Sequence, residues 1–312
     1  MEQESRVINW LLNGDVSIQY QTHRDILKSD RVTLKSLRDR IEQEGWGVIY
    51  LTFRKMDGYW GRGFYQPKWT CSHYTLLELK NLGISPENKE IKESLRLIFD
   101  QRKGNDGGIY PIGTLRKSDV CINGMVMNYA SYFGVPEHEL KSIVDFILSQ
   151  HMSDGGFNCQ SNRKGAVHSS LHSTLSVLEG IVEYSLHGYK YRLPELQVAE
   201  NQSREFILKH RLFKSDKTGE IIDKKMLLLS HPSRWRFDIL RALDYFRASQ
   251  TPYDPRMNDA LLIIQSKKRN DGTWPLQGKH PGQVFFEMEK PGEPSRWNTL
   301  RTLRVLNHFK FS

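Results

Sequence analysis

The hydrophobic positions of this chain recur at intervals of three and four residues, with charged residues between them. That spacing places the apolar side chains on one face of an α-helix. Such segments alternate with segments that are apolar on most sides. We expect the first kind to form half-buried outer helices, such as Leu34/Leu37/Ile41, Ile91/Leu95/Ile98 and Leu140/Ile143/Val144/Ile147. We expect the second kind to form inner helices, such as Leu76/Leu77/Leu79, Leu171/Leu175/Leu178/Ile181, Ile239/Leu240/Leu243 and Leu300/Leu303/Leu306.

A short phrase built on Asp-Gly separates outer from inner segments. Its copies begin at Asp57, Asp106, Asp154 and Asp271. The phrase predicts a turn, because Asp can bond the backbone ahead of it and Gly adopts positive φ without steric cost. The first three copies lie 49 and 48 residues apart and the fourth follows after 117, which leaves room for a degenerate copy near Asp216 and Gly219. Such a period indicates a repeated supersecondary unit.

When an N-terminal pair is included, the pattern gives six pairs, each of one outer and one inner helix. Six helical hairpins can close a ring. The repeat runs nearly end to end, and no linker or low-complexity tract interrupts it. We therefore expect residues 1–312 to form one all-α domain, an (α/α)6 toroid or double-layered helical barrel.

A second repeat stands at the expected entrances of inner helices. Residues 232–235 and 294–297 both read Pro-Ser-Arg-Trp, and residues 67–70 are a shortened relative. Pro and Ser suit the beginning of a helix. A cation in the first turn of a helix is locally unfavourable, so an anion would compensate both Arg234 and Arg296. The alternative is that each arginine is paired with a nearby carboxylate.

Aromatic residues gather at the same entrances. Trp69, Trp235 and Trp297, with Tyr74, could form an aromatic wall that stabilises carbocations, packs isoprenyl chains or stacks on sugar rings. The alternative is that such residues seal the seams between repeats, and we favour that interpretation for Trp274.

Composition narrows the classes of protein. The net charge of +9 is spread along the chain instead of forming a tail, so we expect most basic residues to solvate outer helices and no nucleic acid to bind. No segment approaches the roughly 20 apolar residues of a membrane span, and residues 1–14 lack the apolar core of a signal peptide. Three cysteines give no even disulfide set, so reduced thiols are expected. These features predict a soluble, cytoplasmic protein.

One candidate metal set lies at neighbouring inner helices. Asp119 and Cys121 open one expected helix, and His172 lies in the first turns of the next. Carboxylate, thiolate and imidazole are all zinc ligands, and three protein ligands leave a fourth position for substrate. The alternative is a small buried cysteine and a structural histidine.

The repeated glycine phrases resemble those of the α/α-toroid superfamily, which contains terpenoid cyclases and the β subunits of protein prenyltransferases. The order of residues 106–108 (Asp-Gly-Gly), Asp119-x-Cys121 and His172-Ser173-Thr174 is similar to the prenyltransferase zinc order. The resemblance implies a zinc that activates a substrate thiolate for attack on an isoprenyl diphosphate. It also implies a diphosphate-binding basic pair at Arg116 and Lys117, and a separate partner subunit.

The chain departs from both branches of that superfamily. Ile122 and Met125 stand where prenyltransferases have aromatic pocket residues, and neither Asp-x-Asp-Asp nor Asp-Asp-x-x-Asp, the motifs of cyclases, occurs. The leading hypothesis is therefore a prenyltransferase- or cyclase-like enzyme for an apolar anion such as a lipidic diphosphate. Two alternatives are a hydrolase or lyase on acidic glycans, with His231, Asp238 and Glu287 as catalytic residues, and a non-catalytic binding toroid.

Overall fold

The computed structural model describes residues 2–111 and 117–311, and helices dominate them. The outer layer contains α1 (Glu2–Leu12), α3 (Arg31–Arg40), α4 (Gly45–Thr52), α6 (Lys89–Arg102), α8 (Glu137–Ser149), α11 (Leu193–Lys209) and α13 (Asn258–Ser266). The inner layer contains α2 (Val16–Thr22), α5 (Ser72–Leu82), α7 (Val120–Tyr132), α10 (Leu171–Leu186), α12 (Ile239–Ala248) and α14 (Arg296–Phe309). Short elements are the π-helix η1 (His23–Leu27), α9 (Ser161–Lys164), the 3₁₀ helices η2 (Lys224–Leu227) and η3 (Pro255–Met257), and antiparallel strands β1 (Trp274–Pro275) and β2 (Pro294–Ser295).

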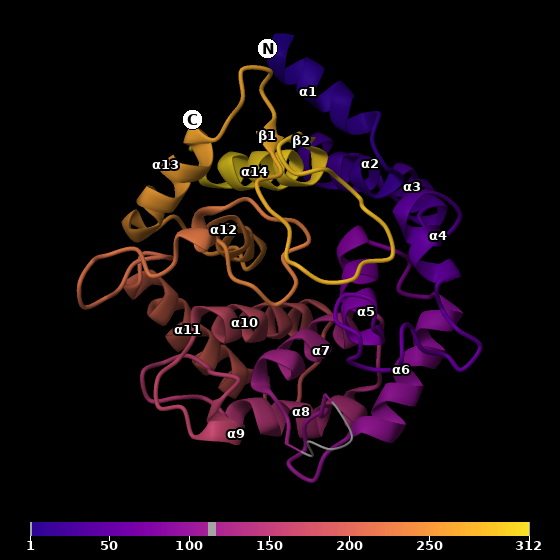
Figure 1. Ribbon diagram of the computed structural model, residues 1–312, viewed down its shortest axis with the longest axis vertical. Helices are drawn as coiled ribbons and strands as arrows, with labels where there is room; N and C mark the ends of the chain where they lie inside the picture. The colour runs from indigo at the N-terminus through magenta and orange to yellow at the C-terminus, as the bar shows by residue number, and fades with distance from the viewer. Residues whose placement is uncertain (1, 112–116, 312) are drawn as a thin grey trace.

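The inner helices follow one another around a ring (Figure 1). Along the ring α5 contacts α7, α7 contacts α10, α10 contacts α12, and α12 contacts α14. The C-terminal α14 then packs on α2, and α4 bridges α2 and α5, which closes the circle. Outer helices pack on the inner helices that precede them in the chain, for example α8 on α7 and α11 on α10. The predicted all-α toroid of six hairpins is confirmed.

The Asp-Gly phrases form the predicted turns. Their glycines, Gly58, Gly107, Gly155 and Gly272, have φ of +83°, +87°, +94° and +87°. In three copies the aspartate accepts a hydrogen bond from the amide two residues ahead, at 2.9 to 3.3 Å. Gly219, in the expected degenerate copy, also has positive φ (+74°). The turn therefore recurs because glycine adopts positive φ without steric cost.

The fourth residue of each phrase ties the turn to the inner helix that follows. It is buried in all four copies, and its backbone amide donates to a side-chain oxygen in the first turns of that helix. The pairs are Trp60 with Ser72 (2.9 Å), Ile109 with Asn123 (2.7 Å), Phe157 with Thr174 (3.0 Å) and Trp274 with Thr299 (2.9 Å). This bond satisfies an amide that burial would otherwise leave unpaired.

The two tryptophans of these phrases also seal the outer layer. The Trp60 indole donates to the carbonyl of Tyr50 in α4, and the Trp274 indole donates to the carbonyl of Ile264 in α13, both at 2.7 Å. Each bond caps a carbonyl in the last turn of an outer helix. Trp274 is buried and joins α13 to α14.

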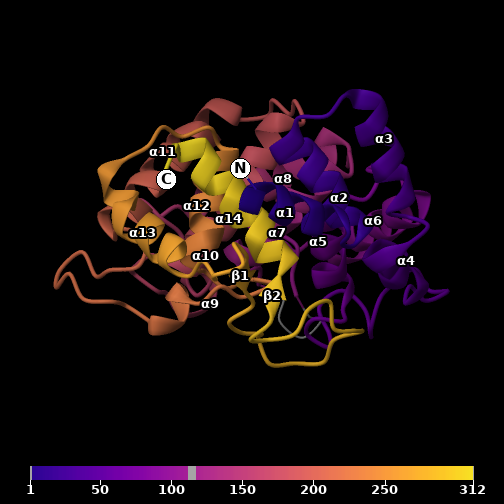
Figure 2. The ribbon, with the colours of Figure 1, turned by 90° about the horizontal axis from the view of Figure 1, so that it is seen from above.

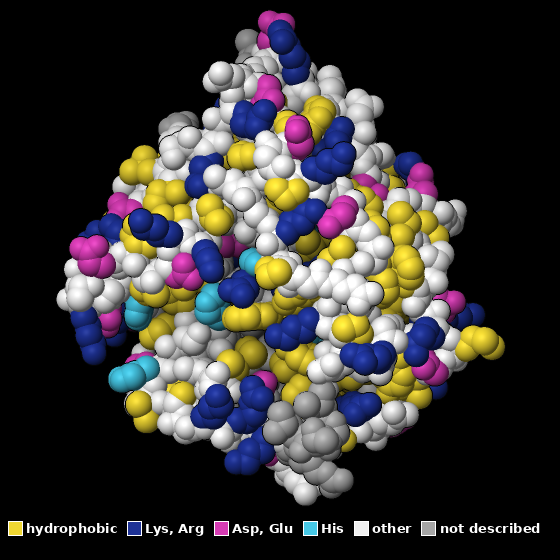
Figure 3. Space-filling model, viewed as in Figure 1, with side chains coloured by type: hydrophobic (Ala, Val, Ile, Leu, Met, Phe, Trp, Pro, Cys, Tyr) yellow, Lys and Arg dark blue, Asp and Glu magenta, His cyan; other side chains and the backbone are white. Residues whose placement is uncertain are grey.

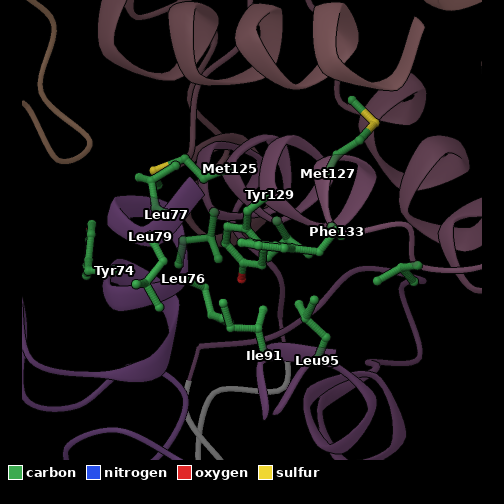
Figure 4. Close-up of a cluster of buried hydrophobic side chains, with 14 of the residues drawn as sticks. Tyr74, Leu76, Leu77, Leu79, Ile91, Leu95, Met125, Met127, Tyr129 and Phe133 are labelled. Carbon is green, nitrogen blue, oxygen red and sulfur yellow. The ribbon is translucent and has the colours of Figure 1, made fainter. Parts of the chain in front are cut away.

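Two glycines allow α7 and α10 to approach closely. A Cβ atom at Gly124 would lie 2.7 Å from the Ser176 carbonyl oxygen and the Val177 Cα atom. A Cβ atom at Gly180 would collide with the backbone oxygen of Gly124. Next to this contact, Met125 and Tyr129 of α7 lie in the buried cluster with Leu76 of α5 (Figure 4). The two helices therefore form a closely packed part of the ring wall.

The surface agrees with the expected spread of charge. On the face shown in Figure 3, Lys and Arg side chains are distributed among acidic and apolar ones instead of forming one patch. Within the described residues, no helix combines the length and the apolar character that crossing a bilayer requires.

Candidate functional site

The ends at which the inner helices begin are covered by two long loops, residues 228–238 and 276–295, which pass in front of the ring in Figure 1. Within this cover the Trp69 indole donates to the carbonyl of Pro281 at 2.8 Å. Phe285 stacks on Phe53 of the outer layer, with ring centroids 4.3 Å apart. The loops are also joined to each other, because Gln277 N donates to Leu229 O at 2.9 Å.

A cavity of about 430 Å³ lies along the ring axis, lined mainly by the second halves of the inner helices. Leu186, an exposed residue of its lining, stands at the end of α10. Arg24 and His187, also at helix ends, have side chains 39% and 35% exposed, whereas the Arg234 and Glu78 side chains are 4% and 1% exposed. The mouth of the cavity is therefore at the C-terminal ends of the inner helices, and its floor lies near the covering loops.

Positive charge exceeds negative charge in this cavity. Among the described residues, eight Lys or Arg side chains line it and four carboxylates do. The cations are Arg24, Arg38, Lys80, Arg234, Arg241, Arg247, Arg301 and Arg304, and the carboxylates are Glu78, Glu179, Glu183 and Asp244. Asp25, a fifth carboxylate, pairs with Arg24 and Arg304 from behind the lining.

Asp244 of α12 is the centre of the largest ion-pair network. It contacts Arg247 at 2.8 Å and Arg301 at 3.3 Å, and it also pairs with Arg304. Burial alone would raise the pKa of Asp244, but the charges of these arginines outweigh it and hold the pKa well below its usual range. This network joins α12 to α14, and Arg304 extends it to Asp25 beside α2 at 2.8 Å.

Two further cations at the mouth share one tyrosine. The guanidinium groups of Arg24 and Arg38 lie 5.5 and 5.1 Å from the centroid of the Tyr20 ring. Arg38 also donates to the Tyr20 hydroxyl group. A cation held over an aromatic ring keeps its charge and fixed position, so both can face a ligand at the mouth.

The floor is organised by Glu78 of α5 and Arg234 of the covering loop. Their side chains form an ion pair at 3.5 Å, and both are almost completely buried. Burial raises the pKa of Glu78, and the charges of Arg234, Arg301 and Arg241 oppose that rise. Arg234 also lies over the Trp69 ring, 5.4 Å from its centroid. Its backbone has φ of +56°, which is unusual for arginine.

Five of the buried side chains that line the cavity, which we group as its floor, have a polar atom without a hydrogen-bond partner among the described residues. They are Glu78 (Oε2), Asn128 (Oδ1), His231 (Nε2), Arg234 (Nη1) and Trp297 (Nε1). Each residue is at least nine-tenths buried. Buried polar groups in proteins are nearly always paired, so a cluster of five indicates a place built to receive polar groups.

His231 was predicted as a candidate catalytic residue, and it lines this floor. Its ring stands edge-on to Trp297, with centroids 4.9 Å apart. Burial lowers the pKa of His231 well below its ordinary value, and the charges of Arg301 and Arg234 add to that effect. The imidazole is therefore neutral at physiological pH, and its unprotonated nitrogen can accept a hydrogen bond.

The predicted aromatic wall is divided between the floor and the covering loops. Trp297 lines the cavity, and Trp69 and Tyr74 pack beside Arg234 with ring centroids 4.7 Å apart. Trp235 lies outside the cavity lining, where its ring meets His172 at 5.2 Å and the guanidinium of Arg236 at 4.8 Å.

The prediction that Arg296 faces the central cavity is wrong. Its Nε atom donates to the carbonyl of Trp10 in α1 at 3.1 Å, and its guanidinium covers the Trp10 ring. The two Pro-Ser-Arg-Trp phrases are not equivalent in the structure. Ser295 caps α14 directly, whereas α12 begins only after Asp238, five residues beyond Ser233. Arg234 therefore precedes its helix and can reach inward, and Arg296 belongs to its helix and faces outward.

Two predicted catalytic carboxylates have structural positions outside the cavity lining. Asp238 is the N-cap of α12 and accepts from the Arg241 amide at 2.8 Å. Glu287 is 56% exposed on the covering loop and pairs with Lys279. Asp238 and Glu287, which the glycan-enzyme alternative names as catalytic residues, therefore do not line this cavity. Arg116, predicted to bind diphosphate, lies outside the described residues.

The predicted zinc ligands do not fit a shared metal site in this arrangement. Asp119 pairs with Arg163 at 2.6 Å, and burial raises the pKa of Asp119 to about 6 although Arg163 opposes it. Cys121 and Cys159 are free thiols, and the neighbouring Cys159 together with burial raises the pKa of the Cys121 thiol well above its usual range. His172 Nδ1 accepts from the Phe237 amide at 2.7 Å. Among the described residues no three His, Cys, Asp or Glu side chains converge as a metal site would require.

Sequence reasoning missed most of the cavity residues, although a signal existed. Inner helices that are otherwise apolar carry charges at three- and four-residue spacing in their second halves. Examples are Glu179 and Glu183 in α10, Asp244 and Arg247 in α12, and Arg301 and Arg304 in α14. Charges on a buried helical face are costly unless they meet partners or a ligand, so these positions mark the cavity.

Comparison with known proteins gives no family by sequence. No protein-family model matches the chain, and no curated protein does. Among solved structures, the chain is similar to the type II terpene cyclase MstE from Scytonema in its apo form. The match has 11% sequence identity and a TM-score of 0.33, and it covers 84% of this chain and 94% of that chain.

Proposed function

We propose that the protein is an enzyme whose central cavity binds a small organic anion and transfers a proton to or from it at Glu78. The observation that carries this proposal is the excess of cationic side chains around the central cavity. Like charges repel strongly where solvent is partly excluded. An anion at the mouth would relieve this repulsion, and guanidinium groups offer the forked donors that phosphate and carboxylate prefer.

Glu78 and His231 give the floor an acid and a base. Burial favours the protonated form of Glu78 and the neutral form of His231, so one can donate a proton and the other can accept one. Arg234 would hold an oxygen of the ligand next to Glu78, since the two side chains are in contact. Once a substrate is identified, Glu78→Gln should reduce turnover by about 10²- to 10⁴-fold while binding persists; unchanged turnover would exclude this role.

The same cationic mouth would suit the diphosphate of an isoprenoid, the ligand implied by the resemblance to prenyltransferases. Zinc has no part in the proposal, because its predicted ligands are engaged with other groups. Whether the ligand has an apolar or a polar body depends on the chemistry of the cavity floor.

Anion binding is tested by calorimetric titration with inorganic pyrophosphate. The test variant Arg24→Gln/Arg38→Gln removes two cations at the mouth. The matched control, Arg6→Gln/Lys35→Gln, removes two cations from exposed ion pairs on α1 and α3. We expect the test variant to bind at least about tenfold more weakly, a loss of about 1.4 kcal/mol, and the control to bind like the wild type. Equal weakening in both variants, or no binding to the wild type, would contradict the proposal.

A further inference from the structure

The floor of the cavity differs chemically from its mouth. At the mouth the surplus groups are cations, which only donate hydrogen bonds. On the floor the unpartnered atoms are mixed. Arg234 Nη1 and Trp297 Nε1 are donors, Asn128 Oδ1 is an acceptor, and His231 Nε2 takes either role according to its tautomer. Glu78 Oε2 accepts when ionised and can donate when protonated.

Building on the proposed anion site, we propose that the floor is a subsite for the hydroxyl groups of the ligand. The ligand is then a hydroxyl-rich anion, a sugar phosphate or a sugar acid, with its charged group at the mouth and its polyol body on the floor.

A hydroxyl group is the ligand group that matches this mixture of hydrogen-bond donors and acceptors on the floor. The oxygens of a fully ionised phosphate monoester or carboxylate only accept hydrogen bonds, so they could serve Arg234 and Trp297 but not the Asn128 oxygen. A hydroxyl group donates and accepts at once. A polyol can therefore satisfy Asn128 and Trp297 together, which a bare anion cannot.

An isoprenyl chain would fit the same floor poorly. Its hydrocarbon would offer none of the five polar atoms a hydrogen bond. Each buried polar group that is left unpaired weakens the complex. Apolar side chains such as Leu77, Val182 and Ala248 also line the cavity, and they belong to the inner helices.

The floor atoms come from separate parts of the fold. Glu78 belongs to α5, Asn128 to α7 and Trp297 to α14, and His231 and Arg234 belong to the covering loop. The Trp297 ring is fixed by edge contacts with His231 and with Trp46, whose centroid is 6.3 Å away. The cluster is therefore a property of the closed ring, and the volume of about 430 Å³ is in the usual range of small-molecule sites.

The test compares ligands of similar charge by calorimetric titration: inorganic phosphate, glucose 6-phosphate, ribose 5-phosphate and geranyl monophosphate, with glucuronate against acetate as the carboxylate pair. We expect at least one hydroxylated anion to bind the wild type about tenfold or more tightly than its bare counterpart and than geranyl monophosphate. A preferred sugar phosphate or a preferred uronate identifies the charged group.

Two floor variants and one control locate the preference. Asn128→Leu and Trp297→Phe each remove one floor atom, and both should reduce the preference for the hydroxylated ligand by about threefold or more while leaving phosphate binding unchanged. The control Ser131→Ala changes a buried residue of α7 that does not line the cavity and should keep the preference. Because both floor variants are tested, a folding defect in one, detected by thermal unfolding, leaves the other informative.

The outcomes separate this inference from the proposal beneath it. If pyrophosphate binds at the mouth but hydroxylated and bare anions bind equally, or geranyl monophosphate binds best, the hydroxyl subsite is wrong and the anion site stands. A preference that persists in both floor variants also overturns the subsite. If no anion binds, the proposed function itself fails.

Discussion

Replacing Arg234 with methionine should destabilise the fold by an amount that depends on pH. The variant leaves Glu78 buried without its ion-pair partner, which lies 3.5 Å away in the wild type. Removing one partner of a buried pair typically costs about 3–5 kcal/mol. Here the electrostatic part of the cost has a ceiling, because Glu78 can take up a proton instead of remaining charged.

The ceiling follows from the ordinary glutamate pKa of 4.5. Each pH unit above that value adds about 1.36 kcal/mol to the cost of protonating the carboxylate. The electrostatic penalty is therefore at most about 3.4 kcal/mol at pH 7 and about 1.4 kcal/mol at pH 5.5. A carboxyl group whose pKa is raised on folding favours the native state when protonated, so the penalty grows as pH rises. Arg241 and Arg301 remain nearby and keep the penalty below this ceiling.

The assay is urea unfolding of wild type, Arg234→Met and Glu78→Gln/Arg234→Met at both pH values. The single variant should lose up to about 2 kcal/mol more stability at pH 7 than at pH 5.5. The double variant has no carboxylate at this position, so its loss should be nearly the same at both. A loss in Arg234→Met that does not change with pH, or an equal pH dependence in the double variant, would refute the assignment of Glu78 and Arg234 as a buried pair.

Three further substitutions test the ring itself. Gly180→Ala should destabilise by about 2 kcal/mol in urea unfolding, because a collision with the α7 backbone outweighs the gain of about 1 kcal/mol from helix propensity; stability equal to wild type would contradict the close approach. Asp244→Asn should cost about 3–5 kcal/mol near neutral pH and less below about pH 4, where the wild-type contribution is lost as its low pKa is approached; an equal cost across this range would contradict the ion-pair network. Trp274→Phe should cost about 1 kcal/mol by removing the indole hydrogen bond to the Ile264 carbonyl, which keeps its bond from the Lys267 amide, and a neutral result would contradict a stabilising role for this bond. For zinc, the metal content of tag-free wild type and His172→Ala should be equal by elemental mass spectrometry, since His172 already accepts a backbone bond; zinc lost only in the variant would contradict that placement.

The turns and the two layers could be predicted from the sequence because local rules decide them. Gly58, Gly107, Gly155 and Gly272 all occupy the positive φ that the Asp-Gly phrase requires. Helical periodicity in turn separated buried from half-buried helices. Both signals act within a few residues, where conformational preference and burial pattern determine the outcome.

The site could be predicted only in part because loops and long-range pairs decide it. Glu78 and Arg234 meet across 156 positions of sequence, and no local pattern indicates their contact. The repeated Pro-Ser-Arg-Trp phrase suggested equivalent positions, yet one arginine faces the cavity floor and Arg296 covers Trp10. The loop of residues 276–295 closes the ends at which the inner helices begin, which moves the mouth to the opposite end.

The most direct measurement of the central claim is the position of a heavy oxyanion in crystals soaked with tungstate, located by anomalous diffraction. We expect a dominant peak inside the ring, within hydrogen-bonding distance of the guanidinium groups at the mouth, with Arg24, Arg38 and Arg247 as the contacts. That peak should weaken in Arg24→Gln/Arg38→Gln and persist in Arg6→Gln/Lys35→Gln. Peaks confined to the outer helices, with none in the cavity, would contradict an anion site at the centre of the toroid.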